Sequence, residues 1–289
     1  MKDNLLNCLL DLKYRYVSIL RTIYNWYKNR HLSYTALSLD DVKSKYKKSD
    51  TIFILGSAES INDITDEQWR TVAQHDSFGI NKWPMHDFAP TFYYTNYPRN
   101  KIHLYCYLNS IKEKIARYHN TIFFVSFNRA VRRGMHPRVF PDFFSKNPLC
   151  CFYEAAPPIK LTGNKIFGCD SFELTLHYRG ALSLILDLVD KLGYRNIVLL
   201  GVDLINAVHF YDSYPEMQWQ VETKYAQSIQ INRNRKHGTM SDKNGTKVTM
   251  DQYIYAVDRY YFKPKNVRLY VGSSASILAE KIPVYDFKN

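Results

Sequence analysis

Short, mainly apolar segments alternate with helix-like segments from residue 49 to the end of the chain. The apolar segments read TIFILG, DSFGIN, PTFYYTN, TIFFVSF, NIVLLGVDL and VRLYVGSS. Strands that are apolar on both faces are typical of a parallel sheet covered by helices on both sides. The alternation therefore predicts an α/β fold with a Rossmann-like, doubly wound, mostly parallel sheet.

Three segments between or after these strands carry the pattern of helices. TDEQWRTVAQ has acidic residues in its first turn and Thr65 placed to cap it. ALSLILDLVDKLGY is strongly apolar and is expected to stop at Gly193, and SASILAE predicts a short last helix. Together with the strands, these helices predict one catalytic or binding domain over residues 49–289.

Residues 206–250 interrupt the alternation. This stretch is polar, dotted with aromatic side chains and has little periodicity. An insert of such length inside a compact α/β domain is usually a lid or a binding segment. It also follows the carboxyl end of a predicted strand, where sheets of this kind bind ligands. We therefore expect residues 206–250 to form a small lid.

Residues 1–48 have a different character. Between residues 4 and 30, apolar side chains recur at helical spacing with five lysines and arginines among them. This pattern indicates a basic amphipathic helix, either an anchor to a membrane surface or a helix packed on the protein's own core or on another subunit. The polar stretch DDVKSKYKKSD is expected to link this helix to the domain.

The composition indicates the charge of the protein's partners and the cellular compartment in which it works. The chain of 289 residues has a net charge of +12 and 24 tyrosines, which indicates an anionic partner such as nucleic acid, an acidic membrane or a phosphorylated substrate. No run of about 18 apolar residues suggests a membrane span. Five cysteines without CxxC spacing, and no secretory leader pattern, favour a reducing, cytoplasmic location and disfavour a zinc site.

Small and polar residues follow several of the predicted strands. Because the carboxyl ends of parallel strands share one edge of the sheet, we expect these residues to cluster there, with His237 available from the insert. Amide side chains suit a nucleobase or a ribose, and small residues let backbone N–H groups reach a phosphate. The alternative is that these residues only make turns. The residues are Gly56, Ser57, Asn81, Asn96, Gly201, Val202, Asp203, Gly272, Ser273 and Ser274.

The first of these turns, GSAES, matches neither GxGxxG nor the phosphate loop GxxxxGK[ST], so a dehydrogenase and a kinase of those types fit poorly. Six segments in a fixed order do resemble one family. ILGSAESIND, FGIN, FYYTN, YRGALSLILDLVDKLGYRNIVLLGVDL, KHGTMSD and VRLYVGSSASIL are similar to motifs of the bacterial lipooligosaccharide sialyltransferases, glycosyltransferase family forty-two. The resemblance covers about residues 50–280.

This resemblance implies a variant of the GT-A fold, an inverting transfer from a CMP-activated sugar, and no metal or other cofactor. It implies that Gly56 and Ser57 lie against the donor, that Asn81 and Asn96 contact its phosphate, ribose or sugar, and that Asp203 closes the supporting strand. His237 would be the general base, although His209, His177 and His86 also lie near predicted site segments. Tyr211 would hydrogen-bond the leaving phosphate.

The chain also departs from the family pattern. Ile205 stands where the family has its other leaving-group tyrosine, and Ala58 and Glu59 stand where it has Gly and Pro. Arg179 and Gly180 occupy the start of the long helix, where Arg179 is a candidate to bind a carboxylate or phosphate, the alternative being a surface salt bridge. These changes leave CMP-Kdo open as the donor.

The preferred hypothesis is a cytoplasmic sialyltransferase held at the inner face of the cell membrane, acting on a glycolipid or oligosaccharide acceptor. Under this hypothesis the protein makes peripheral contact with an anionic membrane and binds no nucleic acid. A homo-oligomer stays open. One alternative is a metal-dependent pyrophosphokinase-like enzyme that uses ATP and a pterin. Another is a non-catalytic protein that binds anionic glycans or nucleic acid.

Overall fold

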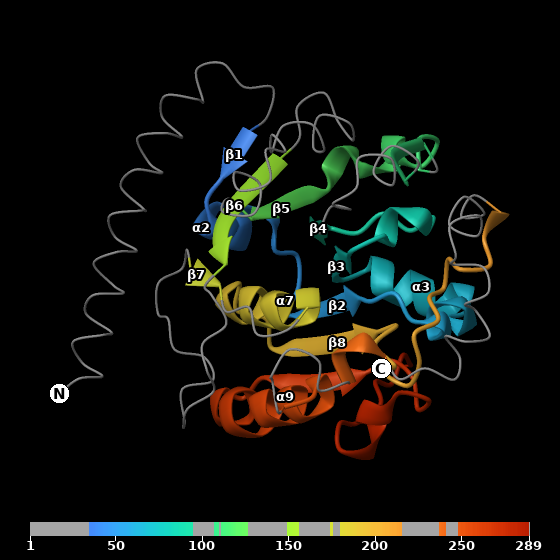
Figure 1. Cartoon of the computed structure of the whole chain (residues 1–289). Helices are drawn as coiled ribbons and strands as arrows, with labels where there is room; N and C mark the ends of the chain where they lie inside the picture. The colour runs from blue at the N-terminus through green and yellow to red at the C-terminus, as the bar shows by residue number, and fades with distance from the viewer. Residues whose placement is uncertain are drawn as a thin grey trace.

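The computed structural model describes residues 35–94, 107–109, 111–126, 149–155, 174–175, 180–215, 237–240 and 248–288. Within these residues a nine-stranded sheet forms the centre of the molecule (Figure 1). All pairings between its strands are parallel, as expected for a Rossmann-like α/β fold. The strands are β1 (Thr35–Leu37), β2 (Thr51–Leu55), β3 (Asp76–Ile80), β4 (Phe92–Tyr94), β5 (Ile122–Ser126), β6 (Leu149–Ala155), β7 (Leu174–Thr175), β8 (Asn196–Leu200) and β9 (Arg268–Val271).

The order of the strands places a reversal of the chain beside β2. The order is β1-β6-β5-β4-β3-β2-β8-β9, with β7 paired to β6. From β2 the chain moves outward through β3, β4, β5 and β6, and then returns to the other side of β2 as β8. Thr51 pairs with Asn196 and Leu55 with Leu200 in this parallel register. The carboxyl ends of β2 and β8 therefore form the switch point at which doubly wound sheets bind ligands.

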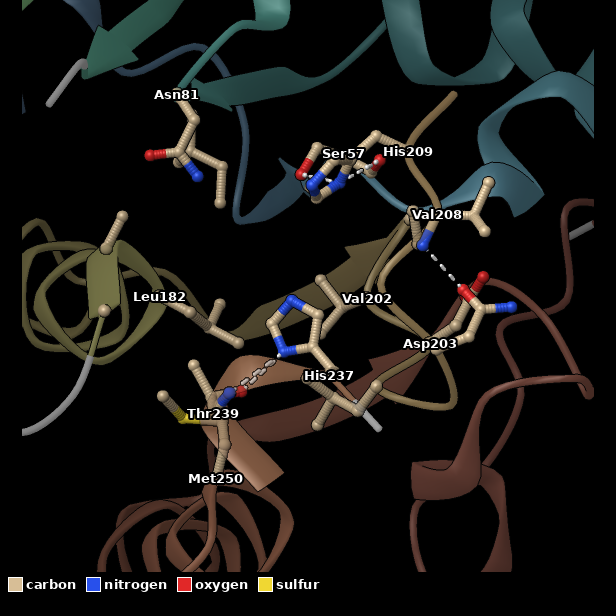
Figure 2. Close-up of a pocket in the computed structure, with 18 residues that line it drawn as sticks. Ser57, Asn81, Leu182, Val202, Asp203, Val208, His209, His237, Thr239 and Met250 are labelled. Atoms are coloured by element: carbon tan, nitrogen blue, oxygen red, sulfur yellow. Dashed lines mark hydrogen bonds between the residues drawn. The ribbon is translucent and has the colours of Figure 1, made fainter. Parts of the chain in front are cut away.

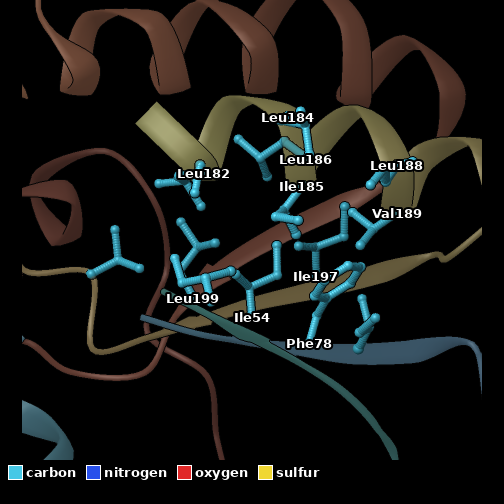
Figure 3. Packing of buried hydrophobic residues seen from close by; sticks show 14 of the residues in the cluster. Ile54, Phe78, Leu182, Leu184, Ile185, Leu186, Leu188, Val189, Ile197 and Leu199 are labelled. Atoms are coloured by element: carbon cyan, nitrogen blue, oxygen red, sulfur yellow. The ribbon is translucent and has the colours of Figure 1, made fainter. Parts of the chain in front are cut away.

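Each face of the sheet is buried under its own apolar cluster, which is why most strand residues are apolar. On one face, Ile52 and Ile54 of β2 belong to a cluster with the leucines of α7 (Gly180–Lys191) and with Ile254 of α9 (Met250–Val257). On the other face, Phe53 and Leu55 belong to a cluster with Val72 of α3 (Asp66–Ala73). Figure 3 shows α7 lying over the first face.

The caps of two helices agree with their sequence signals. The Thr65 hydroxyl accepts the backbone N–H of Gln68, and the Gln68 side chain accepts the N–H of Thr65, which completes a capping box at the start of α3. Gly193, with a φ of 77°, follows the end of α7 in the left-handed conformation that glycine favours. The expected last helix is a short 3₁₀ turn, η10 (Ile277–Glu280).

The folded domain begins upstream of residue 49. Residues 35–48 were expected to end a helical segment and to form a linker, but they contribute β1, the short α2 (Leu39–Asp41) and the π-helical η1 (Val42–Tyr46). β1 pairs with β6, and the Val42 side chain is fully buried in the core. The expected amphipathic helix over residues 4–30 lies outside the described residues.

Candidate functional site

A pocket opens at the switch point, between the carboxyl ends of β2, β3 and β8 and the first turns of α7 and α9 (Figure 2). It holds about 630 Å³ of empty space, including its mouth to solvent. Its described lining combines backbone turns, amides, hydroxyls and two imidazoles with a few apolar side chains. The lining residues are Gly56, Ser57, Ala58, Ile80, Asn81, Gly180, Ala181, Leu182, Gly201, Val202, Asp203, Leu204, Asn206, Val208, His209, His237, Thr239 and Met250.

The floor of the pocket is a close crossing of the turns after β2 and β8. A Cβ on Gly56 would lie 2.2 Å from the carbonyl oxygen of Gly201, so only glycine fits this position. The N–H of Gly56 donates to the carbonyl of Leu200 at 2.7 Å, and the N–H of Ala58 donates to that of Gly201 at 2.9 Å. The small residues after β2 are therefore required by a neighbouring turn of the same chain.

Asn81 supplies an amide at the end of β3. Its φ of 57° is left-handed, a conformation that Asn adopts more readily than most residues. Its backbone N–H donates to the carbonyl of Tyr94 at 3.0 Å, and its carbonyl accepts the Tyr93 hydroxyl, so the turn is fixed by β4. These contacts hold the residue at the pocket wall, and Figure 2 shows its side chain there.

Asp203 connects the three turns around the pocket. Its Oδ1 accepts the Ser60 hydroxyl at 2.7 Å from the turn after β2, and its backbone carbonyl accepts the N–H of Ile277 at 3.1 Å from the turn after β9. Burial raises the pKa of the Asp203 carboxyl, and the hydrogen bonds from Ser60 oppose this shift. The carboxyl group thus acts as a brace between segments that are distant in sequence.

His209 is held against the turn after β2. Its Nδ1 lies 3.2 Å from the carbonyl oxygen of Ser57 and 3.3 Å from the Ser57 hydroxyl, and an antiparallel bridge joins His209 to Ala58. The ring stacks on that of Tyr211, with centroids 5.1 Å apart. Burial lowers the pKa of His209, with Asp212 opposing and Lys82 adding to the shift. The imidazole is therefore neutral at pH 7.

His237 approaches the same space from the far end of the insert. Its Nδ1 lies 2.7 Å from the hydroxyl oxygen of Thr239, and the backbone N–H of Thr239 donates to the same nitrogen at 3.4 Å. Figure 2 shows the imidazole within the pocket, beside Thr239 and Val202. The three described parts of the insert, residues 206–215, 237–240 and 248–250, thus all contribute to the pocket lining, whereas most of the expected lid lies outside the described residues.

The structure brings together eight of the residues expected at the site. The pocket is lined by Gly56, Ser57, Asn81, Gly180, Gly201, Val202, Asp203 and His237. Arg179 and Asn96 lie outside the described residues.

Four other expected residues are not among the described lining residues. Tyr211 is 5% exposed and packs in the apolar cluster behind His209, with the ammonium of Lys82 5.0 Å from its ring centre. Gly272, Ser273 and Ser274 form a turn behind the pocket: a Cβ on Gly272 would strike Leu200. Ser276, just after them, donates its hydroxyl to the carbonyl of Val202. β9 is one strand further out than β8, so the turn after β9 does not line the pocket. This turn instead supports the pocket wall through the contact of Ser276 with Val202.

Several lining residues were not expected from the sequence. Asn206 and Val208 follow β8, and the Asn206 side chain accepts the N–H of Val208 at 3.0 Å to shape that turn. Thr239 and Met250 lie at the end of the insert and at the start of α9, a helix that the sequence patterns did not predict. His209 had a sequence signal, since it lies six residues after Asp203, but nothing in the sequence revealed its contact with Ser57.

Comparison with known proteins gives no family for this chain: no family model, no curated protein and no solved structure matches it significantly. Across the part of the chain that the structure describes, none of the helices is both long and apolar enough to cross a membrane. The same described residues contain no group of three His, Cys, Asp or Glu side chains arranged to hold a metal ion.

Proposed function

We propose that the protein is a glycosyltransferase that moves sialic acid from CMP-sialic acid to a cell-surface glycan of the lipooligosaccharide or capsule type. The transfer inverts the anomeric centre and proceeds without a metal ion. A histidine of the pocket takes the proton of the acceptor hydroxyl. The observation that carries this proposal is the pocket at the switch point of the sheet, lined by residues of the motifs that resemble the sialyltransferases.

The start of α7 supports an anionic donor. This helix of 12 residues begins at Gly180 on the pocket wall, so the positive end of its dipole faces the pocket. N–H groups in the first turn of a helix have no partner within that helix, and they bind phosphate groups readily. A phosphate at this wall fits a CMP-activated sugar, whose leaving group gains negative charge as the glycosidic bond breaks.

Neutral donors around the pocket support the same class of ligand. Asn81 offers an amide that donates and accepts, while Ser57 and Thr239 offer hydroxyls. Such groups suit the cytosine edge, the ribose or the phosphate of CMP. The resemblance gives the role of base to His237, and the pocket contains His209 as a second imidazole.

The direct test measures release of CMP from purified protein supplied with a lipooligosaccharide-type acceptor and either CMP-sialic acid or CMP-Kdo. Turnover with the first donor supports the proposal, and turnover with CMP-Kdo alone moves the assignment to a Kdo transferase. Loss of turnover on adding EDTA would point to a metal-dependent reaction. If the folded protein consumes neither donor and does not bind CMP in calorimetry, the proposal fails.

A pair of variants links this activity to the pocket. Asn81→Gly keeps the left-handed backbone but removes the amide, so it should weaken CMP binding by about fivefold to tenfold, the value of one or so net hydrogen bonds. Thr65→Ser is the control, because it keeps the cap of α3 and Thr65 is not among the described lining residues. Equal CMP affinity in Asn81→Gly and the parent would place the nucleotide elsewhere.

A further inference from the structure

Two histidines enter the same pocket, and their hydrogen-bond partners favour opposite tautomers. A neutral imidazole carries one N–H donor and one acceptor nitrogen, and the partner of the first nitrogen decides the role of the second. His209 and His237 each use Nδ1 in a contact with the protein. Whether the partner of Nδ1 donates or accepts a hydrogen bond therefore decides which imidazole has a lone pair on Nε2 to take a proton.

For His209 the partner of Nδ1 is a carbonyl oxygen, which only accepts hydrogen bonds. Nδ1 lies 3.2 Å from the Ser57 carbonyl oxygen and 3.3 Å from the Ser57 hydroxyl oxygen, and a proton on Nδ1 satisfies the carbonyl, which has no proton of its own to give. The lone pair of the neutral ring is then on Nε2. The antiparallel bridge to Ala58 and the stacking on Tyr211 hold the ring in this orientation. His209 is therefore arranged as a proton acceptor at the pocket.

For His237, Nδ1 makes two contacts with Thr239, and one of them is with a backbone N–H, which only donates. The N–H of Thr239 points at Nδ1 from 3.4 Å, and the Thr239 hydroxyl lies 2.7 Å from the same nitrogen and is able to donate to it as well. Nδ1 is then the acceptor and the ring proton is on Nε2. His237 is therefore arranged as a hydrogen-bond donor, the opposite of what a general base requires.

Charged groups around His209 adjust its basicity. A carboxylate oxygen of Asp212 accepts the backbone N–H of His209 at 2.8 Å, and Asp212 favours the imidazolium form of the ring. Lys82, which follows β3, opposes it, as does burial. The ring is thus neutral before the reaction, and Asp212 is placed to stabilise the charge that the ring gains on taking a proton.

We propose that His209 is the catalytic base of the transfer and that His237 does not take this proton. The assignment rests on the proposed function. The acceptor oxygen forms a bond to the anomeric carbon as the bond from that carbon to the CMP phosphate oxygen breaks. The acceptor proton passes to Nε2 of His209, giving an imidazolium, and CMP leaves with the bonding electron pair.

The tautomers are measurable without any substrate, by nitrogen-15 NMR of histidine-labelled protein at neutral pH. His209→Gln and His237→Gln assign the two sets of signals. We expect the proton on Nδ1 in His209 and on Nε2 in His237. A proton on Nε2 of His209 would overturn the assignment, because that nitrogen would then have no lone pair to offer.

The pH profile of kcat/KM tests the catalytic role. His209→Gln should lower kcat/KM by about 10²–10⁴-fold and remove the acidic limb of the profile, whereas His237→Gln should keep that limb. Asp212→Asn should move the acidic limb to lower pH, because it removes a charge that favours the imidazolium. An acidic limb that is unchanged in His209→Gln would overturn the base assignment.

A CMP-binding measurement distinguishes a wrong assignment of the base from a wrong proposed function. A parent protein that binds CMP and transfers sugar, together with an unchanged acidic limb in His209→Gln, refutes the role of His209 alone. A folded parent that neither binds CMP nor consumes a CMP-sugar refutes the transferase, and the base assignment with it.

Discussion

Gly56→Ala tests whether the close crossing of the β2 and β8 turns holds the pocket together. The added Cβ would lie 2.2 Å from the Gly201 carbonyl oxygen and 2.9 Å from a methyl group of Val202. To reach even the 3.0 Å limit of real Cβ contacts, the two turns must separate by roughly 0.8 Å. The contact is with backbone, so no side-chain rotation relieves it.

The cost follows from the contacts that this separation disrupts. Forcing an extra carbon into a packed interior costs about 1–3 kcal/mol. The hydrogen bonds from Gly56 to Leu200 and from Ala58 to Gly201 would stretch, at about 1 kcal/mol each. Replacing glycine by alanine also lowers the conformational entropy of the unfolded chain, which stabilises the folded state by about 0.4–1 kcal/mol. We expect Gly56→Ala to lower the free energy of unfolding by about 2–4 kcal/mol.

Urea unfolding followed by circular dichroism measures this change, and Gly238→Ala is the matched control. The control introduces the same methyl group where no atom lies within 4 Å, so its effect should stay within about 0.5 kcal/mol. CMP calorimetry on folded Gly56→Ala should also show weaker binding, since both turns line the pocket. A free energy of unfolding equal to that of the control would refute the argument.

Three further outcomes are expected. Burial among aromatic rings lowers the pKa of His86 to about 4, and its Nδ1 accepts the N–H of Phe88, so the folded protein keeps this ring neutral. Stability should therefore fall as the pH drops from 6.5 towards 4, by up to about 3 kcal/mol, and urea titrations should show a smaller fall in His86→Phe. Thr65→Ala removes the cap of α3 and should cost about 1 kcal/mol in the same assay, a loss that Thr65→Ser should avoid. Asn81→Ala should be less stable than Asn81→Gly by about 1 kcal/mol in thermal unfolding, because its backbone φ is 57°.

The sequence predicted the central strands and helices well because their signals are local. β2 and β8 are apolar runs after their first residue, and Thr65 and Gly193 mark the ends of helices by their own chemistry. β1 is only three residues long, too short for a periodic pattern, and it is a strand through its pairing with β6. The linker predicted just after it, DDVKSKYKKSD, contributes residues to α2 and η1 instead, and its Val42 is buried in the core.

The candidate site was predicted in part for the same reason. Asn81 and Asp203 follow the strands next to the switch point, so the rule that carboxyl ends cluster placed them well. Ser273 also follows a strand, but β9 lies outside β8, and the order of strands is not written in the sequence. The contact of His209 with Ser57 joins residues 152 positions apart, which no local pattern reveals.

The parallel pairing of β2 with β8 also bears on how the chain folds during synthesis. Thr51 of β2 pairs with Asn196 of β8, which is synthesised much later. One edge of β2, a strand buried along its whole length, therefore has no partner strand until about two thirds of the chain has been synthesised. An uncovered apolar edge strand is a site of aggregation, and long-range parallel pairing is slow to form. Productive synthesis of this protein therefore depends on protection of the edge of β2 until β8 arrives.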